Sequence, residues 1–182
     1  MMRFFRHVLI VFASSVAALP PGEAAEQTLQ TACSLLTTSE VEAALGLPLT
    51  PPANYDTQVP SGPAQGQTIR MCLWPRGTQN HSVTLSVSPA MAPLIPNALQ
   101  PQSQQYYDMF QKQGYTLDKQ TFDNGMCLAV APSATARAKA FVTNCTLQAK
   151  GMQLHVMASS TTNAVPPESV KKLVDLAITR LR

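Results

Sequence analysis

Apolar side chains recur along this chain with two different periods, and the period changes from one segment to the next. Apolar and polar residues alternate strictly over 81–88, where the apolar positions are Val83, Leu85 and Val87. That period of two predicts a strand with one buried and one solvated face. Near the C-terminus the spacing is three and four, with apolar residues at Val170, Leu173, Val174, Ala177, Ile178 and Leu181. That spacing predicts an amphipathic helix over 167–181.

The stretch Cys33–Gly46 contains both a start signal and a stop signal for a helix. Thr37 is a good N-cap, and Glu40 three residues later completes a capping box, in which each side chain bonds the backbone N–H of the other residue. Gly46 supplies a left-handed stop at the C-terminal end. We therefore expect a helix over 38–45.

The remaining segments extend this pattern to a whole fold. We expect strands over 69–74 and 81–88, a helix over 102–113, and further strands near 120–123, 126–131, 139–147 and 151–158. Residues 47–68 are rich in proline, glycine, glutamine and threonine, and we expect a long irregular loop there. The order α-β-β-α-β-β-β-α, in which a fourth late strand is possible, predicts an α+β fold. Its sheet would be mainly antiparallel, with the helices packed on one face.

The first 25 residues have the composition of a secretion signal. Two arginines precede an apolar run, Val8–Leu19, of about a dozen residues, which is the length expected for a signal peptide. We expect the mature chain to begin near Ala25 or Glu26. A transmembrane helix needs roughly 20 apolar residues, so the run is too short to span a membrane. The sequence predicts a signal peptide over 1–25 and a single domain over 26–182, periplasmic or secreted, with no transmembrane segment.

The charge of the chain argues against a nucleic-acid partner. Once the signal peptide is removed, 11 basic and 9 acidic residues remain, and the basic residues are scattered apart from Lys171 and Lys172. Nucleic-acid-binding proteins instead gather basic residues on one face or along one stripe. We therefore expect no nucleic-acid partner.

Four cysteines in an exported chain are expected to form two disulfides, because the compartment is oxidising. Three pairings are possible from the sequence, and we favour Cys33–Cys72 with Cys127–Cys145. The second pair flanks a single turn, so it can join two adjacent antiparallel strands. The first pair closes a ring of about 40 residues, for which the chain-entropy model gives roughly 4 kcal/mol of stabilisation.

A metal or redox site has weaker support. The chain has no C-x-x-C pair and no clustered histidines, which disfavours zinc and thioredoxin-like chemistry. The segment 152–157 offers thioether and imidazole groups, which suit copper. Alternation along a strand leaves only His155 and Met157 on a common face, so such a site would have to recruit Met71 or Met126 from neighbouring strands. Packing explains these side chains more simply, and we expect no metal or other cofactor.

A hydrolase is the enzymatic alternative. The only histidines after the signal peptide are His81 and His155, and no G-x-S-x-G motif is present. His81 borders a turn, where exposure to solvent is expected. A hydrolase that uses His81 or His155 stays open, although a surface or half-buried histidine accounts for each of them.

Carboxylates and aromatic side chains add no firmer site. Glycoside hydrolysis needs a pair of carboxylates, but Glu40 is assigned to the capping box, and Asp118 and Asp123 flank a strand, where turn roles suffice. Four aromatic residues are candidates for a ligand groove: Trp74, Tyr106, Tyr107 and Tyr115. The helical spacing of Tyr106 and Phe110 is more typical of a core, so we expect no catalytic residues.

The opening of the chain resembles a broad group of exported bacterial domains of unknown function, many of them actinobacterial lipoproteins. The shared motif is Cys33-x-Leu35-Leu36-Thr37-x-x-Glu40-Val41, followed by Cys72-x-Trp74. The resemblance covers residues 33–88. It implies a fold of the Mog1/PsbP type and a disulfide between Cys33 and Cys72, and it carries no catalytic residues. The residues before Cys33 do not match a lipidation motif, because Gln30 stands where a bulky apolar residue is usual.

The sequence therefore favours binding over catalysis. It combines few charges and long polar loops with no complete catalytic constellation. We expect an exported, non-catalytic α+β domain of the cell envelope that binds a protein, a peptide or a small molecule. The secreted hydrolase is the alternative.

Overall fold

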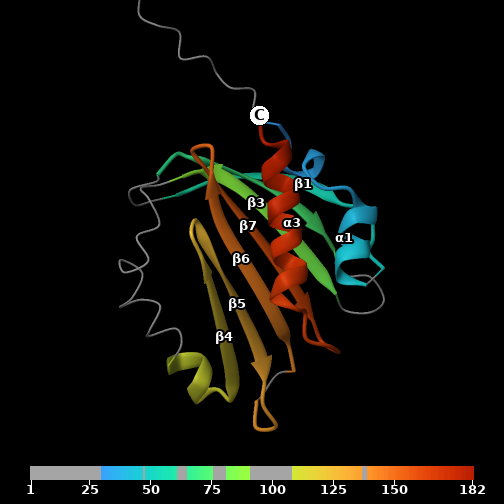
Figure 1. The fold of residues 1–182 in the computed structure, drawn as a ribbon, viewed down its shortest axis with the longest axis vertical. Coiled ribbons are helices and arrows are strands. Elements are labelled where there is room, and N and C mark those ends of the chain that lie inside the picture. The colour runs from blue at the N-terminus through green and yellow to red at the C-terminus, as the bar shows by residue number, and fades with distance from the viewer. Residues whose placement is uncertain (1–29, 47, 61–64, 76–80, 91–107, 137–138) are drawn as a thin grey trace, which may run out of the picture.

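The fold is an antiparallel sheet of seven strands that carries helices on one face (Figure 1). The computed structural model describes residues 30–46, 48–60, 65–75, 81–90, 108–136 and 139–182, so the expected signal peptide lies outside the described residues. The helical elements are η1 (Ala32–Ser34), α1 (Thr38–Leu45) and α3 (Pro167–Arg180). The strands are β1 (Ala53–Gln58), β2 (Thr68–Trp74), β3 (Ser82–Pro89), β4 (Tyr115–Phe122), β5 (Gly125–Pro132), β6 (Phe141–Ala149) and β7 (Met152–Ser160).

The strands lie in the order β1-β2-β3-β7-β6-β5-β4, and every neighbouring pair is antiparallel. The last strand of the chain, β7, therefore lies in the middle of the sheet and joins β1–β3 to β4–β6. The expected α+β class, the antiparallel sheet and the helices on one face are confirmed. The order of elements gains one early strand, since three strands rather than two precede the helical segment before β4.

That additional strand, β1, corrects the loop expected over 47–68. The sequence of β1 is polar and its side chains are almost all exposed, so it has no alternating apolar signal. It is an edge strand, held by its backbone pairing with β2, from Ala53 opposite Leu73 to Gln58 opposite Thr68. The Asn54 side chain also accepts a hydrogen bond from the backbone N–H of Cys33 at 3.1 Å. Long-range pairing, which a local pattern does not record, forms this strand.

The hydrophobic core lies between the sheet and the helices. α3 packs across β6 and β7 and also contacts α1, so the two helices cover the same face (Figure 1). Val170, Leu173, Val174 and Ala177 are the buried side of α3, which confirms the predicted amphipathic helix. Trp74 is fully buried, and its indole N–H donates to the Thr38 hydroxyl at 3.2 Å. This hydrogen bond connects α1 to β2.

The two disulfides pair as the sequence favoured: Cys33 with Cys72, and Cys127 with Cys145. The first joins the segment of η1 to β2. The second joins residues that lie directly opposite each other on β5 and β6. Both bonds lie on the helix side of the sheet, where Cys72, Cys127 and Cys145 are fully buried.

α1 forms as its start and stop signals predicted. Thr37 and Glu40 make both bonds of the capping box, and Gly46 is left-handed at φ 67°. Glu40 has a second partner that the capping pattern did not reveal, because Arg180 near the end of α3 forms an ion pair with it. Arg180 therefore binds a carboxylate and also the carbonyl oxygen of Leu35, in addition to lying at the negative end of its own helix.

The other helical segment is described only in part. Residues 108–112 are helical, and the earlier part of the expected helix 102–113 lies outside the described residues. Gly114 ends the segment with a φ of 82°, and Phe110 packs edge-to-face on Tyr115 with ring centroids 5.8 Å apart. None of the helices in the described part of the chain is long and apolar enough to cross a membrane.

Candidate functional site

One face of the sheet carries α1 and α3, and the opposite face is the candidate site. Side chains alternate along each strand, so the buried residues Val83, Leu85 and Val87 mark the helix side of β3, and the residues between them point to the other side. The pairing register extends this assignment across the sheet. We call the opposite side the open face. It comprises Ala53, Tyr55, Thr57, Ile69, Met71, Leu73, Ser82, Thr84, Ser86, Ser88, Tyr115, Leu117, Lys119, Thr121, Met126, Leu128, Val130, Pro132, Val142, Asn144, Thr146, Gln148, Gln153, His155, Met157 and Ser159.

The open face is divided into bands that run along the strands. On the three central strands, β3, β7 and β6, every open-face position except Met157 and Val142 is polar, and we call these strands the polar band. On β2 and β5, which lie on either side, every open-face position is apolar, and we call these the apolar bands. Among the described positions of the open face only Lys119, on the edge strand β4, is charged.

His155 lies at the centre of the polar band. Its direct neighbours across the strands are Ser86 on β3 and Thr146 on β6. Burial of the imidazole lowers its pKa below the ordinary value, because a charged ring is poorly solvated there. The neutral form, which donates through one ring nitrogen and accepts through the other, is therefore favoured at neutral pH.

Asn144, diagonal to His155, leaves one acceptor unused. It pairs in register with Met157 on one side and Leu128 on the other. Its Oδ1 atom is buried and accepts no hydrogen bond from any part of the chain that the structure describes. Buried acceptors without a donor are uncommon in folded proteins. The polar band therefore contains an acceptor that the described part of the chain leaves unused.

The residues that were weighed as copper ligands, His155, Met157, Met71 and Met126, all lie on the open face, but they are spread across several strands. Met71 and Met126 lie in the same row as His155, Met71 beyond Ser86 and Met126 beyond Thr146. Each methionine is two strand spacings from His155, roughly 10 Å between Cα atoms. They lie on opposite sides of the histidine, so one ion cannot be held by His155 and both methionines. No cluster of three His, Cys, Asp or Glu side chains suited to a metal occurs among the described residues either.

The two histidines of the alternative hydrolase lie on opposite sides of the sheet. His81 is only 3% exposed, so the expectation of a solvent-exposed side chain is wrong. It continues the alternation of β3 onto the helix side, next to the core. His155 has a hydroxyl neighbour in Ser86, but the described open face carries no carboxylate that would orient the imidazole, as the triad mechanism requires.

The carboxylates considered for catalysis do not form a pair. Glu40 is engaged by Thr37 and Arg180 at the α1 side of the molecule. Asp118 is an exposed residue of β4, and Asp123 lies in the turn between β4 and β5, at the far edge of the sheet from β1. Nothing in their placement joins them to Glu40.

The aromatic candidates also separate. Trp74 belongs to the core, and Tyr115 is half-buried on the open face against Phe110, while Tyr106 and Tyr107 lie outside the described residues. The large exposed aromatic of the open face is Tyr55, 49% exposed on β1. Sequence reasoning missed it because its strand lay within the expected loop. The alternation of Tyr55 and Thr57 was too short a signal.

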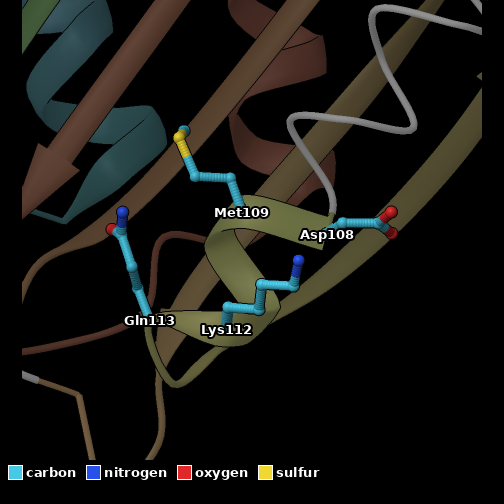
Figure 2. Close-up of a pocket in the computed structure, with 4 residues that line it drawn as sticks. All are labelled: Asp108, Met109, Lys112 and Gln113. Atoms are coloured by element: carbon cyan, nitrogen blue, oxygen red, sulfur yellow. The ribbon is translucent and has the colours of Figure 1, made fainter.

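A shallow hollow of about 350 Å³ lies beside the helical segment 108–112. Its described lining consists of Asp108, Met109, Lys112 and Gln113 (Figure 2). Met109 and Gln113 extend to one side of the helical turn, and Asp108 extends to the other. All four residues come from one short segment and are exposed, so the described lining does not form the converging walls of a small-molecule site.

The fold is similar to that of a solved extracellular domain. The extracellular domain of PknH from Mycobacterium tuberculosis matches with a TM-score of 0.52 and 14% sequence identity, over 81% of this chain and 92% of that domain. No protein-family model and no curated protein matches the sequence. At this identity the likeness concerns the fold alone. It does not identify a family.

Proposed function

We propose that this chain, once residues 1–25 are removed, works outside the cytoplasm as a non-catalytic binding module whose binding surface is the open face. The observation that carries the proposal is the chemistry of that face. A surface built for water is usually about 25–35% charged, whereas the only charge among the described open-face positions is Lys119 at the edge. A broad, nearly uncharged sheet face of mixed polarity suits a partner that also lacks charge.

Two further observations support the proposal. Two disulfides favour an oxidising compartment, since cytosolic thiols are kept reduced. A solved domain with the same fold, the extracellular domain of PknH, is itself extracellular. α1 and α3 cover the opposite side of the sheet, so binding through the open face leaves the core between them and the sheet undisturbed.

The proposal is tested by NMR on the isotope-labelled mature chain, titrated with fractionated envelope extract of its host. Open-face amides, such as those of Ser86 and Thr146, should shift in at least one fraction, while α3 amides should not. Ser86→Lys should abolish the shifts and Gln58→Lys, exposed on β1 and off the open face, should preserve them. Shifts confined to the helix side, or no shifts in any fraction, would contradict the proposal.

The cross-strand neighbours Ser86 and His155 favour the hydrolase as a second candidate. A panel of ester, amide and glycoside substrates, tested with the wild type and with His81→Ala and His155→Ala, separates the two. If turnover is detected and one alanine variant loses it while keeping its fold and disulfides, the non-catalytic module is wrong. Activity that survives in both variants would indicate a contaminant.

A further inference from the structure

The bands of the open face have the dimensions of an extended chain. They run parallel to the strands for about eight residues, which is roughly 27 Å. The two apolar bands, β2 and β5, are separated by the three strands of the polar band, so they lie about 19 Å apart from strand to strand. A long side chain from each apolar band, Met71 and Met126, narrows this gap from either side.

The polar band matches the hydrogen-bonding pattern of a peptide backbone. Its serine, threonine, asparagine and glutamine side chains, and the neutral His155, each both donate and accept. A backbone presents N–H donors and C=O acceptors in alternation, so it can pair with such groups in either direction. Asn144 Oδ1 lacks a donor within the described chain and is buried among the side chains of the band, so a backbone N–H reaches it when that side chain turns outward.

The apolar bands match the side chains of the same segment. In an extended chain successive side chains point to opposite sides. When the backbone polar groups face β7, the side chains therefore point sideways, alternately toward β2 and toward β5. Met71 and Met126 lie in one row on opposite apolar bands. Methionine is flexible and polarisable, so it adapts to apolar side chains of different shape.

The near absence of charge on the described open face disfavours peptide segments that carry charged side chains. A lysine or carboxylate over the polar band would lose water without meeting an opposite charge, because the described open face carries only the peripheral Lys119. An uncharged segment loses less hydration free energy, and its backbone groups replace their hydrogen bonds to water with hydrogen bonds to the polar band.

We infer that the open face binds an extended, uncharged stretch of polypeptide rich in apolar side chains, with its backbone over the polar band and its side chains on the two apolar bands. This inference rests on the proposed function, and it names the class of partner that the open face takes.

The test uses the mature, disulfide-bonded chain and a capped eight-residue peptide of leucine, valine and alanine with a neutral glycine–serine tail. Binding is followed by NMR and calorimetry, beside peptides in which two residues are replaced by aspartate or by lysine. We expect saturable binding of the uncharged peptide, with shifts along β3, β7 and β6, and at least about tenfold weaker binding of both charged peptides.

Variants locate the bound peptide. Ser86→Asp, in the centre of the polar band, should weaken binding about tenfold or more because it places an unpaired charge under the peptide. Gln58→Asp introduces the same group on β1 away from the open face and should leave affinity unchanged. Asn144→Leu removes one hydrogen bond and should weaken binding roughly three- to tenfold. Thermal unfolding of each variant confirms that it is folded.

The outcomes separate this inference from the proposed function. If maltoheptaose or dodecyl maltoside shifts the open-face amides and the peptide does not, the peptide inference is wrong and the binding surface stands. If a charged peptide binds as tightly as the uncharged one, the inference is also wrong. If the peptide, the sugar and the detergent all leave the open face unchanged, as do the envelope fractions, both the inference and the proposed function fail.

Discussion

Glu40 takes part in one local and one long-range interaction. Its carboxylate accepts the Thr37 backbone N–H at 2.9 Å within the capping box, and Arg180 donates to it at 2.8 Å from the end of α3. These bonds, that of Arg180 first, lower the pKa of Glu40 to about 2 from an ordinary 4.5. The capping bond was predictable from a spacing of three residues. The partner 140 residues away was not.

This pKa makes the α1–α3 contact acid-sensitive. Because the folded-state pKa lies below the unfolded value, Glu40 contributes stability above about pH 4.5 and loses it as the pH falls toward 2. In denaturant unfolding, Glu40→Gln should be less stable than the wild type at pH 7, and the gap should close between pH 4.5 and 2. Asp175→Asn, which breaks the exposed pair with Lys171, should cost at most about 1 kcal/mol. A gap that is constant with pH would contradict the assignment.

The elements divide by the kind of signal that forms them. The predicted bounds of β3, α1 and α3 lie within about one residue of the observed bounds. In β3 and α3 burial on one side imposes a periodic pattern, and in α1 the caps mark the two ends. β1 was missed, and β4 was expected near 120–123 but begins at Tyr115. Both are edge strands with many exposed polar residues, so backbone pairing rather than side-chain burial defines them.

The stop of α1 can be tested by one substitution. Gly46 has a φ of 67°, and an added Cβ would meet no atom within 4 Å, so only the backbone conformation disfavours a side chain. Gly46→Ala should lower the free energy of unfolding by about 1 kcal/mol, and Gly46→Asn should cost less, because asparagine adopts this conformation more readily. Equal stability of the alanine variant and the wild type would show that the helix end is not under this constraint.

For the whole molecule, the disulfides join segments that the sheet also joins. Cys33–Cys72 spans 39 residues and connects the N-terminal helical segment to β2, whereas Cys127–Cys145 spans 18 residues within one hairpin. The sequence favoured both pairs from their spacing. Only the register explains why the second pair fits, since the two cysteines are directly opposed.

Removal of the two disulfides should therefore lower the free energy of unfolding by different amounts. The chain-entropy model gives about 4 kcal/mol for the longer ring and about 3 kcal/mol for the shorter one. Urea unfolding of Cys33→Ala/Cys72→Ala and of Cys127→Ala/Cys145→Ala should show the first variant to be the less stable. The opposite ranking would mean that packing around the hairpin bond outweighs the entropy of its ring.

The extent of the mature chain is a prediction at the same scale. Expression of the full sequence in an exporting bacterial host should yield a protein that begins near Ala25 or Glu26 and carries no lipid. Intact mass spectrometry checks both statements, with non-reducing conditions to preserve the two disulfides. A mass that retains residues 1–25, or one that includes a lipid on Cys33, would contradict them.

The sequence by itself determined the α+β class, the buried side of β3 and α3, the capped helix and the preferred cysteine pairs. These features follow from periodicity, caps and spacing, which act over short stretches of chain. The tertiary structure alone decided the open face, because that face combines residues from all seven strands. It also decided that His81 is buried, that Arg180 meets Glu40, and that Met71 and Met126 lie on either side of His155. Strand order and register place these side chains, and pairing between distant segments is not written in any local pattern.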